Sequence, residues 1–553
     1  MELFLLTISL LFFVSILTDK LSSRFGVPSL VLFLLVGMLF GTDGLGIDFD
    51  NIDLAQSIGT IALSVILFSG GMDTKLESIH PVAKEGLLLS TIGVLLTAMI
   101  EGVLIWLLMK WTHTGVELAL PTALLMASTM SSTDSASVFS ILRSKGLRLK
   151  YHLRPMLELE SGSNDPMAAV LTSVMISVVQ AGGAPNVWLL ILSVVFQLLF
   201  GFLMGFFAGK LLVWLMNKVN IENESLYPIL ILTSCIFIFA VTNYTSGNAF
   251  LAVYIGGLVF GNSKFAHKRS TVNFLDGVTW LCQLSMFLTL GLLVNPHELF
   301  QPNVLILGSI ASVIMIFISR PAAVFLSLAP FRKLPFNAKT FISWVGLKGA
   351  SPILFAILCL AAEVPNARLI FNVVFLCTLI SLLLQGMTLS RMATLLGVLE
   401  DNEPQLQKVE NFDIDLPEEI KSVTTEIHIT EDMLQRGNRL MDLGFPQNTL
   451  AIMVKRGQQY FVPTGKSILQ TDDALLVITD NEQTLQETYQ QIENKQNNYK
   501  PAFLDDTADF MREFFAMVKE NRKVKKKNLH QKRLQIKEKK KKHKKNQPNE
   551  TNT

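Results

Sequence analysis

The sequence predicts an all-α polytopic membrane protein of about 13 transmembrane helices, followed by a small cytoplasmic α+β domain. Three observations predict this fold class. Half of the 553 residues are hydrophobic, only 17% are charged, and the mean hydropathy is +0.43, which is too apolar for a soluble protein of several domains. Apolar runs long enough to cross a hydrocarbon core of roughly 30 Å recur as far as about residue 395. After Gly397 the composition turns polar and charged.

The predicted spans are residues 2–19, 28–42, 54–72, 85–110, 119–142, 154–180, 187–217, 226–242, 247–261, 274–294, 303–330, 338–361 and 367–395. Loops rich in Lys and Arg, such as NSKFAHKRS and FRKLPFNAK, alternate with loops that hold almost none, such as AGGAP and TNYTSGN. Because cytoplasmic loops collect basic residues, this alternation predicts an external N-terminus and a cytoplasmic C-terminus. The first run lacks the basic flank and cleavage pattern of a signal peptide, so we expect a retained helix.

The polar C-terminal part predicts separate domains. The membrane domain covers residues 1–397, and a linker covers 398–415. Residues 416–495 hold four strand-like runs, TEIHIT, LAIMVKR, QQYFVP and DALLVITD, and then a helical stretch, without a dinucleotide-binding G-x-G-x-x-G. Residues 496–553 hold an amphipathic segment and a Lys-rich tail. We expect the tail to be disordered; binding to anionic lipid is the alternative, and no nucleic acid is expected.

The four cysteines predict core packing. Cys235, Cys282, Cys359 and Cys377 all fall inside apolar spans, and none has C-x-x-C spacing. The pattern therefore favours neither a disulfide nor a metal site made of cysteines.

Ionisable residues well inside the spans are the candidates for function, because a bilayer penalises charged groups that are neither paired nor hydrated. They are Glu101, Asp134, Glu158, Glu160, Asp165, Arg320 and Lys348. A helical rise of about 1.5 Å per residue places Asp165 near the midplane, with Asp134 and Arg320 at similar depths. Glu158 lies close to a basic loop, where an interfacial role is expected. No role follows for Glu101 from the sequence.

The stretch ESGSNDP presents two different faces of the sixth span. Ser161 and Asp165 are four residues apart and share a face, whereas Glu160 lies about 140° away from Asp165 around the helix. Asp165 and Ser161 can therefore line a cavity while Glu160 turns into the bundle. Because Arg320 is the only arginine inside a span at a comparable depth, we expect Glu160 and Arg320 to form a structural ion pair.

Two spans carry signs of an interrupted helix. The fifth contains MASTMSSTDSAS, a polar run that includes Thr133 and Asp134, and the twelfth contains Gly346, Gly349 and Pro352 in WVGLKGASP. Non-helical backbone at membrane depth is tolerated where it lines a cavity, and its carbonyl groups can coordinate a cation. If the chain holds two inverted repeats, these spans occupy corresponding positions at a transport site. Ordinary small-residue packing is the alternative.

These motifs resemble a known family. ESGSNDP, the preceding Thr-Asp, SRP of the eleventh span and GLKGASP of the twelfth are similar to those of the monovalent cation:proton antiporters in the sodium/proton exchanger superfamily. The resemblance covers residues 1 to about 395, and Lys348 stands where many relatives have Arg. Residues 416–495 resemble the C-terminal subdomain of the domains that regulate potassium conductance (RCK_C). The combination resembles the bacterial potassium/proton antiporters once described as cell-volume regulators.

The resemblance implies roles for five residues. Asp165 would be the carboxylate that binds either a monovalent cation or a proton. Ser161, Asp134 and the backbone of Thr133 would complete the cation site. Asn164 would stand where electrogenic relatives have a second Asp, which implies electroneutral exchange.

The resemblance also implies partners and a location. The substrates would be protons and K⁺, with Na⁺ as the alternative, and Glu160 and Arg320 would form the stabilising pair. Gly346, Lys348, Gly349 and Pro352 would form the second broken helix. A homodimer in the bacterial cytoplasmic membrane is expected, without a cofactor; a small molecule that regulates the cytoplasmic domain is possible, and its identity is open.

A cation channel and an intramembrane enzyme are the alternatives to an antiporter. A cation channel gated by a ligand would need a filter loop such as TVGYG, which is absent from the sequence. An intramembrane enzyme would need a pattern such as G-x-S-x-G or H-E-x-x-H, and neither occurs. We therefore expect a transporter that is not an enzyme.

Overall fold

The chain divides into two compact units, residues 1–401 and 402–553, which are described separately. The computed structural model describes residues 2–25, 28–112, 118–144, 147, 149–182, 186–219, 221–265, 268–400, 424–429, 431–434, 437–445, 449–457, 459–471 and 473–479. Most of the predicted linker, the helical stretch after the last strand, and the amphipathic segment with its Lys-rich tail lie outside these residues.

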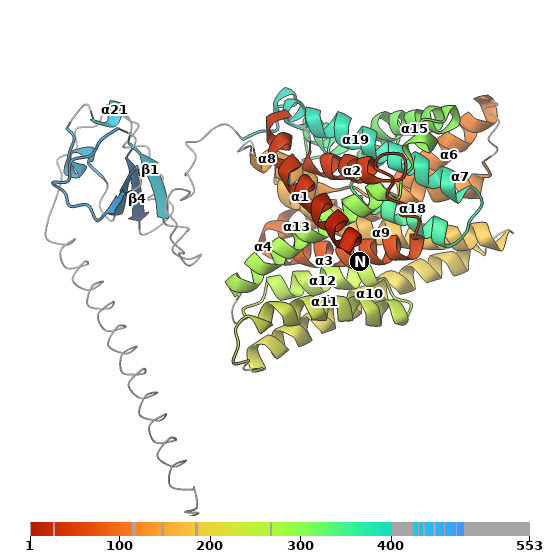
Figure 1. Ribbon diagram of the computed structural model, residues 1–553, viewed down its shortest axis with the longest axis horizontal. Coiled ribbons are helices and arrows are strands. Elements are labelled where there is room, and N and C mark those ends of the chain that lie inside the picture. Colours follow the sequence, from red (N-terminus) through yellow and green to blue (C-terminus); the bar gives the residue numbers. More distant parts are fainter. Residues whose placement is uncertain are drawn as a thin grey trace, which may run out of the picture. The chain divides into compact units, whose positions relative to one another are not determined.

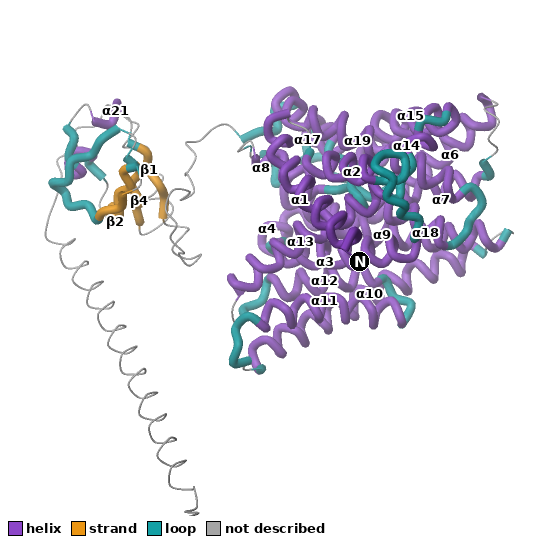
Figure 2. Tube along the Cα trace, viewed as in Figure 1, coloured by secondary structure: helices purple, strands orange, loops and turns teal. Residues whose placement is uncertain are grey.

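The first unit consists of helices joined by connecting segments (Figures 1 and 2). Its helices are α1 (Glu2–Phe25), α2 (Ser29–Phe40), α3 (Ile52–Asp73), α4 (Leu76–Ile79), α5 (Ala83–Leu88), α6 (Val94–Thr112), α7 (Leu120–Thr129), α8 (Ser135–Ser144), α9 (Leu153–Ala181), α10 (Val187–Lys218), α11 (Leu226–Tyr244), α12 (Ala249–Gly261), α13 (Lys268–Leu292), α14 (Pro296–Leu299), α15 (Pro302–Ile314), α16 (Arg320–Ser327), α17 (Phe336–Trp344), α18 (Ser351–Ala361) and α19 (Ala367–Leu395). A 3₁₀ turn, η1 (His80–Val82), follows α4. Two π-helical turns, η2 (Leu89–Gly93) and η3 (Met315–Ser319), precede α6 and α16.

Among the described residues, seven helices are long and apolar enough to cross a membrane. They are Ile52–Asp73, Leu76–Trp111, Val187–Lys218, Leu226–Tyr244, Ser270–Leu292, Pro302–Ser327 and Ala367–Leu395. Each of the other predicted spans also falls on helical backbone, in shorter apolar helices or in the more polar α9. The chain is thus a multi-pass membrane protein, and the count of 13 crossings stays a prediction.

The helices of this unit pack in two groups. In the first, α3 and α10 flank α12, with α2, α11 and α13 beside them. Figure 1 shows α10, α11 and α12 side by side. Small residues allow this close approach: a Cβ atom on Gly209 of α10 would lie 2.9 Å from the carbonyl oxygen of Gly256 on α12. The second group contains α6, α7, α9 and α15 to α19.

The fifth and twelfth predicted spans are both broken helices. The backbone between Thr129 and Ser135 separates α7 from α8, and that between Trp344 and Ser351 separates α17 from α18. The two breaks touch, because the Asp134 N–H donates to the Leu347 carbonyl at 2.8 Å. Both interruptions lie where the sequence predicts them, and they place non-helical backbone inside the second group of helices.

The cysteines of the membrane unit are unpaired. Cys235, Cys359 and Cys377 are buried thiols, and Cys282 is half-buried. The prediction that they take part in core packing agrees with this placement.

The second unit contains a four-stranded sheet. Its strands are β1 (Thr424–His428), β2 (Thr449–Arg456), β3 (Gln459–Phe461) and β4 (Ala474–Thr479), in the antiparallel order β1-β4-β2-β3. Each of the four strand-like runs in the sequence carries one of these strands. The resemblance of this unit to a regulatory domain stays a prediction.

At one end of the helical unit, Glu298 of α14 is held by α19. Its carboxylate accepts hydrogen bonds from Arg368 Nε at 2.8 Å and from Asn372 Nδ2 at 2.9 Å. Burial alone would raise the pKa of Glu298, but the hydrogen bonds from Arg368, Asn372 and Asn295 hold this pKa at about 2. The carboxylate is therefore ionised in the folded protein over the whole physiological range of pH.

We expect Arg368→Met to destabilise the protein by roughly 1 kcal/mol at neutral pH, since both partners are partly exposed. A lowered carboxyl pKa stabilises the fold above its unfolded value of about 4.3, and this contribution is lost as the pH falls toward about 2. Thermal unfolding in detergent should thus separate wild type from Arg368→Met at pH 7, and the difference should narrow as the pH is lowered to about 3. The exposed Arg332→Met is the control. An equal difference at both pH values would contradict this assignment.

Candidate functional site

The polar residues of α9 face the break in the fifth span. Asp165 is buried, and one of its carboxylate oxygens accepts a hydrogen bond from the Ser132 hydroxyl. Its other carboxylate oxygen accepts from the Ser351 hydroxyl at 3.0 Å. Because Ser132 lies in the first break and Ser351 opens α18, Asp165 is held between the two broken helices.

Ser161 and Asn164 contact the same break. The Ser161 hydroxyl donates to the Thr133 carbonyl at 3.0 Å, and Asn164 Nδ2 donates to the Thr133 hydroxyl oxygen. The Asn164 Oδ1 atom is buried and has no hydrogen-bond partner among the described residues. Ser161 and Asp165 therefore face the same break, as their helical spacing predicts.

Asp134 lies at the contact between the two breaks. Its carboxylate accepts from the Ser137 hydroxyl at 2.5 Å, and a Cβ atom on Gly349 would lie only 2.6 Å from Asp134 Oδ2. The structure therefore brings together all five residues that the sequence analysis assigns to the cation site. They are Asp165, Asp134, Ser161, Thr133 and Asn164.

Three hydroxyl groups of this cluster were missed by the sequence analysis. Ser132, Ser137 and Ser351 all donate to site carboxylates. Ser132 and Ser137 lie in the polar run of the fifth span, and Ser351 directly precedes Pro352. Their positions beside the predicted breaks were the only sequence feature that pointed to a role in the site. Serine is too common in apolar helices for its presence alone to have identified them.

Glu160 and Arg320 are in contact, as the sequence analysis expects. Arg320 Nη2 lies 2.5 Å from Glu160 Oε1, and both side chains are almost fully buried. Arg320 is the first residue of α16 and directly follows the π-helical turn η3. The break in the twelfth predicted span passes close to it. A Cβ atom on Gly346 would lie 2.8 Å from Arg320 Nε. The stabilising role of this pair stays a prediction.

Lys348 joins the second break to the first. Its ammonium group is buried and donates to the Ser132 carbonyl at 2.8 Å, while its backbone N–H donates to the Ser381 hydroxyl oxygen at 3.1 Å. Pro352 is the second residue of α18, a position that needs no amide hydrogen. The residues predicted for the second broken helix thus lie at the break or immediately after it.

The two remaining ionisable residues differ in their surroundings. Glu158 pairs with Arg154 one turn earlier on α9 at 2.9 Å and is partly exposed, in agreement with an interfacial position. Glu101 on α6 is fully buried, and neither of its carboxylate oxygens has a hydrogen-bond partner among the described residues.

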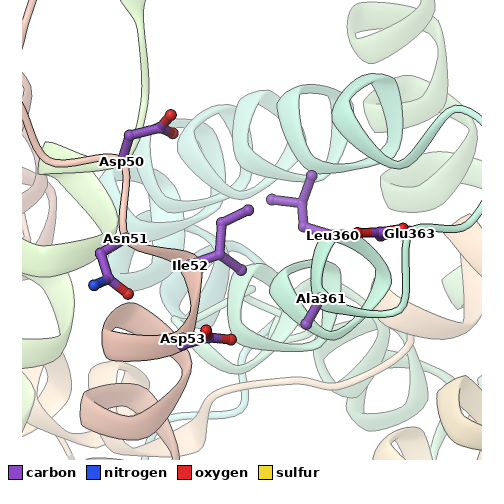
Figure 3. A pocket seen from close by; sticks show the side chains of 7 residues that line it. All are labelled: Asp50, Asn51, Ile52, Asp53, Leu360, Ala361 and Glu363. Atoms are coloured by element: carbon purple, nitrogen blue, oxygen red, sulfur yellow. The ribbon is translucent and has the colours of Figure 1, made fainter.

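A separate cavity of about 510 Å³ lies where α3 begins and α18 ends (Figure 3). It is lined by Asp50, Asn51, Ile52, Asp53, Leu360, Ala361 and Glu363. Asp165 contacts Ser351 at the start of α18, whereas the cavity lies at the other end of this helix, beside Leu360 and Ala361. The cavity contains none of the site residues described above.

Comparison with known proteins agrees with this geometry. Residues 8–395 match the family of sodium/hydrogen exchangers, transmembrane. The chain belongs to this sodium/hydrogen exchanger family. It is therefore a cation:proton antiporter, and the resemblance seen in its motifs is confirmed for the membrane domain.

Sequence similarity to known antiporters extends beyond the membrane domain. The K(+)/H(+) antiporter NhaP of Alkalimonas amylolytica is 36% identical over 480 residues, which cover 86% of this chain and 80% of that protein. The K(+)/H(+) antiporter NhaP2 of Shewanella sp. (strain ANA-3) is 36% identical over 479 residues, 86% of this chain and 81% of that protein. The solved sodium proton antiporter MjNhaP1 of Methanocaldococcus jannaschii shares the fold, with a TM-score of 0.62 at 24% identity. The match covers 72% of this chain and all of that one.

Proposed function

We propose that this antiporter exchanges K⁺ for protons at Asp165, one for one, across the bacterial cytoplasmic membrane. The observation that carries the proposal is the buried Asp165 carboxylate held between two broken helices by Ser132 and Ser351. Relatives named as K(+)/H(+) antiporters, 36% identical over 86% of the chain, support K⁺ as the cation. Na⁺ is the alternative, because a sodium proton antiporter has the same fold.

The groups around Asp165 suit a dehydrated monovalent cation. The Asp134 carboxylate, the Thr133 carbonyl and the Ser161 hydroxyl supply oxygen atoms of the kind that replaces a hydration shell. The hydroxyls that now donate to Asp165 can rotate, so that their oxygens accept the cation instead. Protons and cations then compete for one carboxylate, and neither can be bound without release of the other.

In this proposal, the buried Asp165 carboxylate also couples the movement of the cation to that of the proton. An ionised Asp165 without a cation would carry a bare charge through the apolar part of the protein, which is unfavourable by several kcal/mol. The site therefore changes its exposure only when it is loaded with a proton or a cation. Asn164 is uncharged, so one carboxylate exchanges one positive charge for another, and transport is electroneutral.

We extend this proposal to the membrane topology, the regulation and the oligomeric state of the protein. We infer about 13 crossings in two inverted repeats, with the broken fifth and twelfth spans in corresponding positions. The N-terminus lies outside and the C-terminus in the cytoplasm, where the sheet-containing unit regulates exchange in response to a small molecule that is not identified. The active form is a homodimer.

Proton movement into vesicles that contain the purified protein tests this function. With an imposed pH gradient, adding K⁺ should collapse the gradient, Na⁺ should act more weakly, and choline should have no effect. Setting the membrane potential with an ionophore should leave the exchange rate unchanged. A K⁺ current without proton movement would instead support a channel, and equal rates for K⁺ and Na⁺ would refute the preference.

We expect Gly349→Ala to slow exchange by at least about tenfold, because the new Cβ would lie within 3.0 Å of three Asp134 atoms and force the two breaks apart. The vesicle assay measures this. Gly277→Ala on α13 is the matched control, since nothing lies within 4 Å of a Cβ there. Wild-type exchange by Gly349→Ala would show that the contact between the breaks does not matter for transport.

A further inference from the structure

The turn of α9 that carries Asp165 contains a proline. Pro166 follows Asp165 directly and lies inside the helix. Because proline has no amide hydrogen, the Gly162 carbonyl, four residues earlier, loses its usual hydrogen bond within the helix. The backbone around Asp165 is therefore constrained less by its own helix than the rest of α9 is, and contacts from neighbouring helices are needed to fix its position.

Asn248, the residue that begins the neighbouring helix α12, supplies one such contact. It is buried, and its side-chain nitrogen Nδ2 donates to the Pro166 carbonyl oxygen at 2.7 Å. This carbonyl lies inside α9, where the amide four residues later supplies its ordinary helical hydrogen bond. The bond from Asn248 is therefore not needed to form the helix. What it adds is a fixed separation between α12 and the residue next to Asp165.

Asn248 is itself held in place by two further hydrogen bonds. It is the N-cap of α12, and its side-chain oxygen Oδ1 accepts from the Leu251 N–H at 2.9 Å. Its backbone N–H donates to the Gln197 carbonyl of α10 at 3.0 Å. The oxygen of the planar amide group thus caps α12 while its nitrogen reaches α9, so the position of the donor is fixed by α10 and α12 together.

The other end of the same turn packs on Tyr254 of α12. Tyr254 is buried, and a Cβ atom on Gly162 would lie 2.5 Å from Tyr254 Cζ, so a larger residue at Gly162 would clash with the ring. Helix α12 therefore contacts α9 at Gly162 and at Pro166, on either side of Asp165. These contacts come from the first group of helices, whereas Ser132 and Ser351 hold the carboxylate from the second.

We propose that Asn248 is a positioning residue for transport: its hydrogen bond to Pro166 fixes the proline-containing turn of α9 and so sets the position of the Asp165 carboxylate in the cation site. The inference rests on the proposed function, in which Asp165 binds the cation. It adds a residue of α12, outside the two breaks, to those on which exchange depends.

Loss of this hydrogen bond should weaken cation binding more than proton binding. A dehydrated K⁺ needs several oxygen atoms at once, so a displaced carboxylate no longer acts together with the other oxygens of the site. A proton needs only one carboxylate oxygen and is bound wherever the carboxylate lies. The KM for K⁺ should therefore rise, while the maximal rate at saturating K⁺ should change much less.

Asn248→Ser tests this with the helix cap retained. The serine hydroxyl can still accept from the Leu251 N–H, but the amide that donates to Pro166 is gone. In vesicles we expect the KM for K⁺ to rise about fivefold, the effect of one ordinary hydrogen bond, with the maximal rate reduced by less than about twofold. The unfolding temperature should stay close to that of wild type.

Two further variants separate the cap from the contact with Pro166. Asn248→Ala removes both, so it should raise the KM as Asn248→Ser does and also lower the unfolding temperature. Asn51→Ser is the matched control. Asn51 is the exposed N-cap of α3, and its side-chain oxygen accepts from the Leu54 N–H in the same way, so this variant should keep the wild-type KM.

Restoring the missing hydrogen bond of α9 should make Asn248 less important. Pro166→Ala returns an amide hydrogen to the turn, which can bond to the Gly162 carbonyl. In this background, Asn248→Ser should raise the KM by less than about twofold. An equal rise in both backgrounds would show that Asn248 does not act by constraining the proline-containing turn.

An unchanged KM in Asn248→Ser would also overturn the proposal, because any loss of stability would then reflect a structural role alone. If Asn248→Ser does not fold, Asn248→Thr takes its place, since threonine also keeps a capping oxygen and fills more of the space. The same rise in KM is expected, and its absence refutes the proposal. Failure of the proposed function would be visible separately, as wild-type protein without K⁺-driven proton movement.

Discussion

Replacing Arg320 with Met is expected to prevent recovery of folded protein. The substitution leaves the Glu160 carboxylate buried without a partner, and breaking a buried ion pair from one side typically costs about 3–5 kcal/mol. The free energy of unfolding of an ordinary domain is only about 5–15 kcal/mol, so this loss is a large fraction of it. Thermal unfolding and size-exclusion profiles of the detergent-solubilised protein measure the loss.

The double variant Glu160→Gln with Arg320→Met separates charge from packing. It removes both charges and retains side chains of similar length, so much of the stability lost in Arg320→Met should return. Arg391→Met, at an exposed position of α19, is the matched control and should unfold like wild type. Wild-type stability in Arg320→Met would refute the structural role of the pair.

Replacing Asp165 with Asn is expected to abolish exchange while the protein stays folded. The amide is similar in shape and can still accept a hydrogen bond from Ser132 or Ser351, so the contacts between α9 and the two breaks persist. It binds neither a proton nor a cation under physiological conditions. Proton movement in vesicles should therefore fall to the level of vesicles without protein.

Asp276→Asn, an exposed carboxylate on α13, serves as the control and should exchange at the wild-type rate. The unfolding temperature of Asp165→Asn should lie at or above that of wild type, because an ionised carboxylate is no longer buried. Exchange by Asp165→Asn at the wild-type rate would show that another group carries the proton.

The helical fold was predictable because apolar runs and loop charge depend on the surrounding membrane, and not on tertiary detail. The breaks were also predictable, since Gly346, Gly349 and Pro352 and the polar run around Asp134 oppose continuous helix locally. The contact of Glu160 with Arg320 followed from depth alone, because Arg320 had no competitor at that level. The strands of the second unit followed from their alternating and β-branched residues.

Other features could not be predicted, because they depend on how helices face one another. The hydroxyls of Ser132, Ser137 and Ser351 resemble those of any small-residue packing contact until the two breaks are brought together. In the same way, Lys348 gave no sequence signal that it reaches the Ser132 carbonyl.

Proton release on cation binding is the most direct test of the central claim that one carboxylate serves both ions. Purified protein in weakly buffered detergent solution is mixed with K⁺ at mildly alkaline pH, and the pH change is followed with an indicator dye. The account predicts that K⁺ releases protons from wild type, up to about one per chain, and none from Asp165→Asn. Equal release from the variant, or K⁺ binding to wild type without any release, would contradict it.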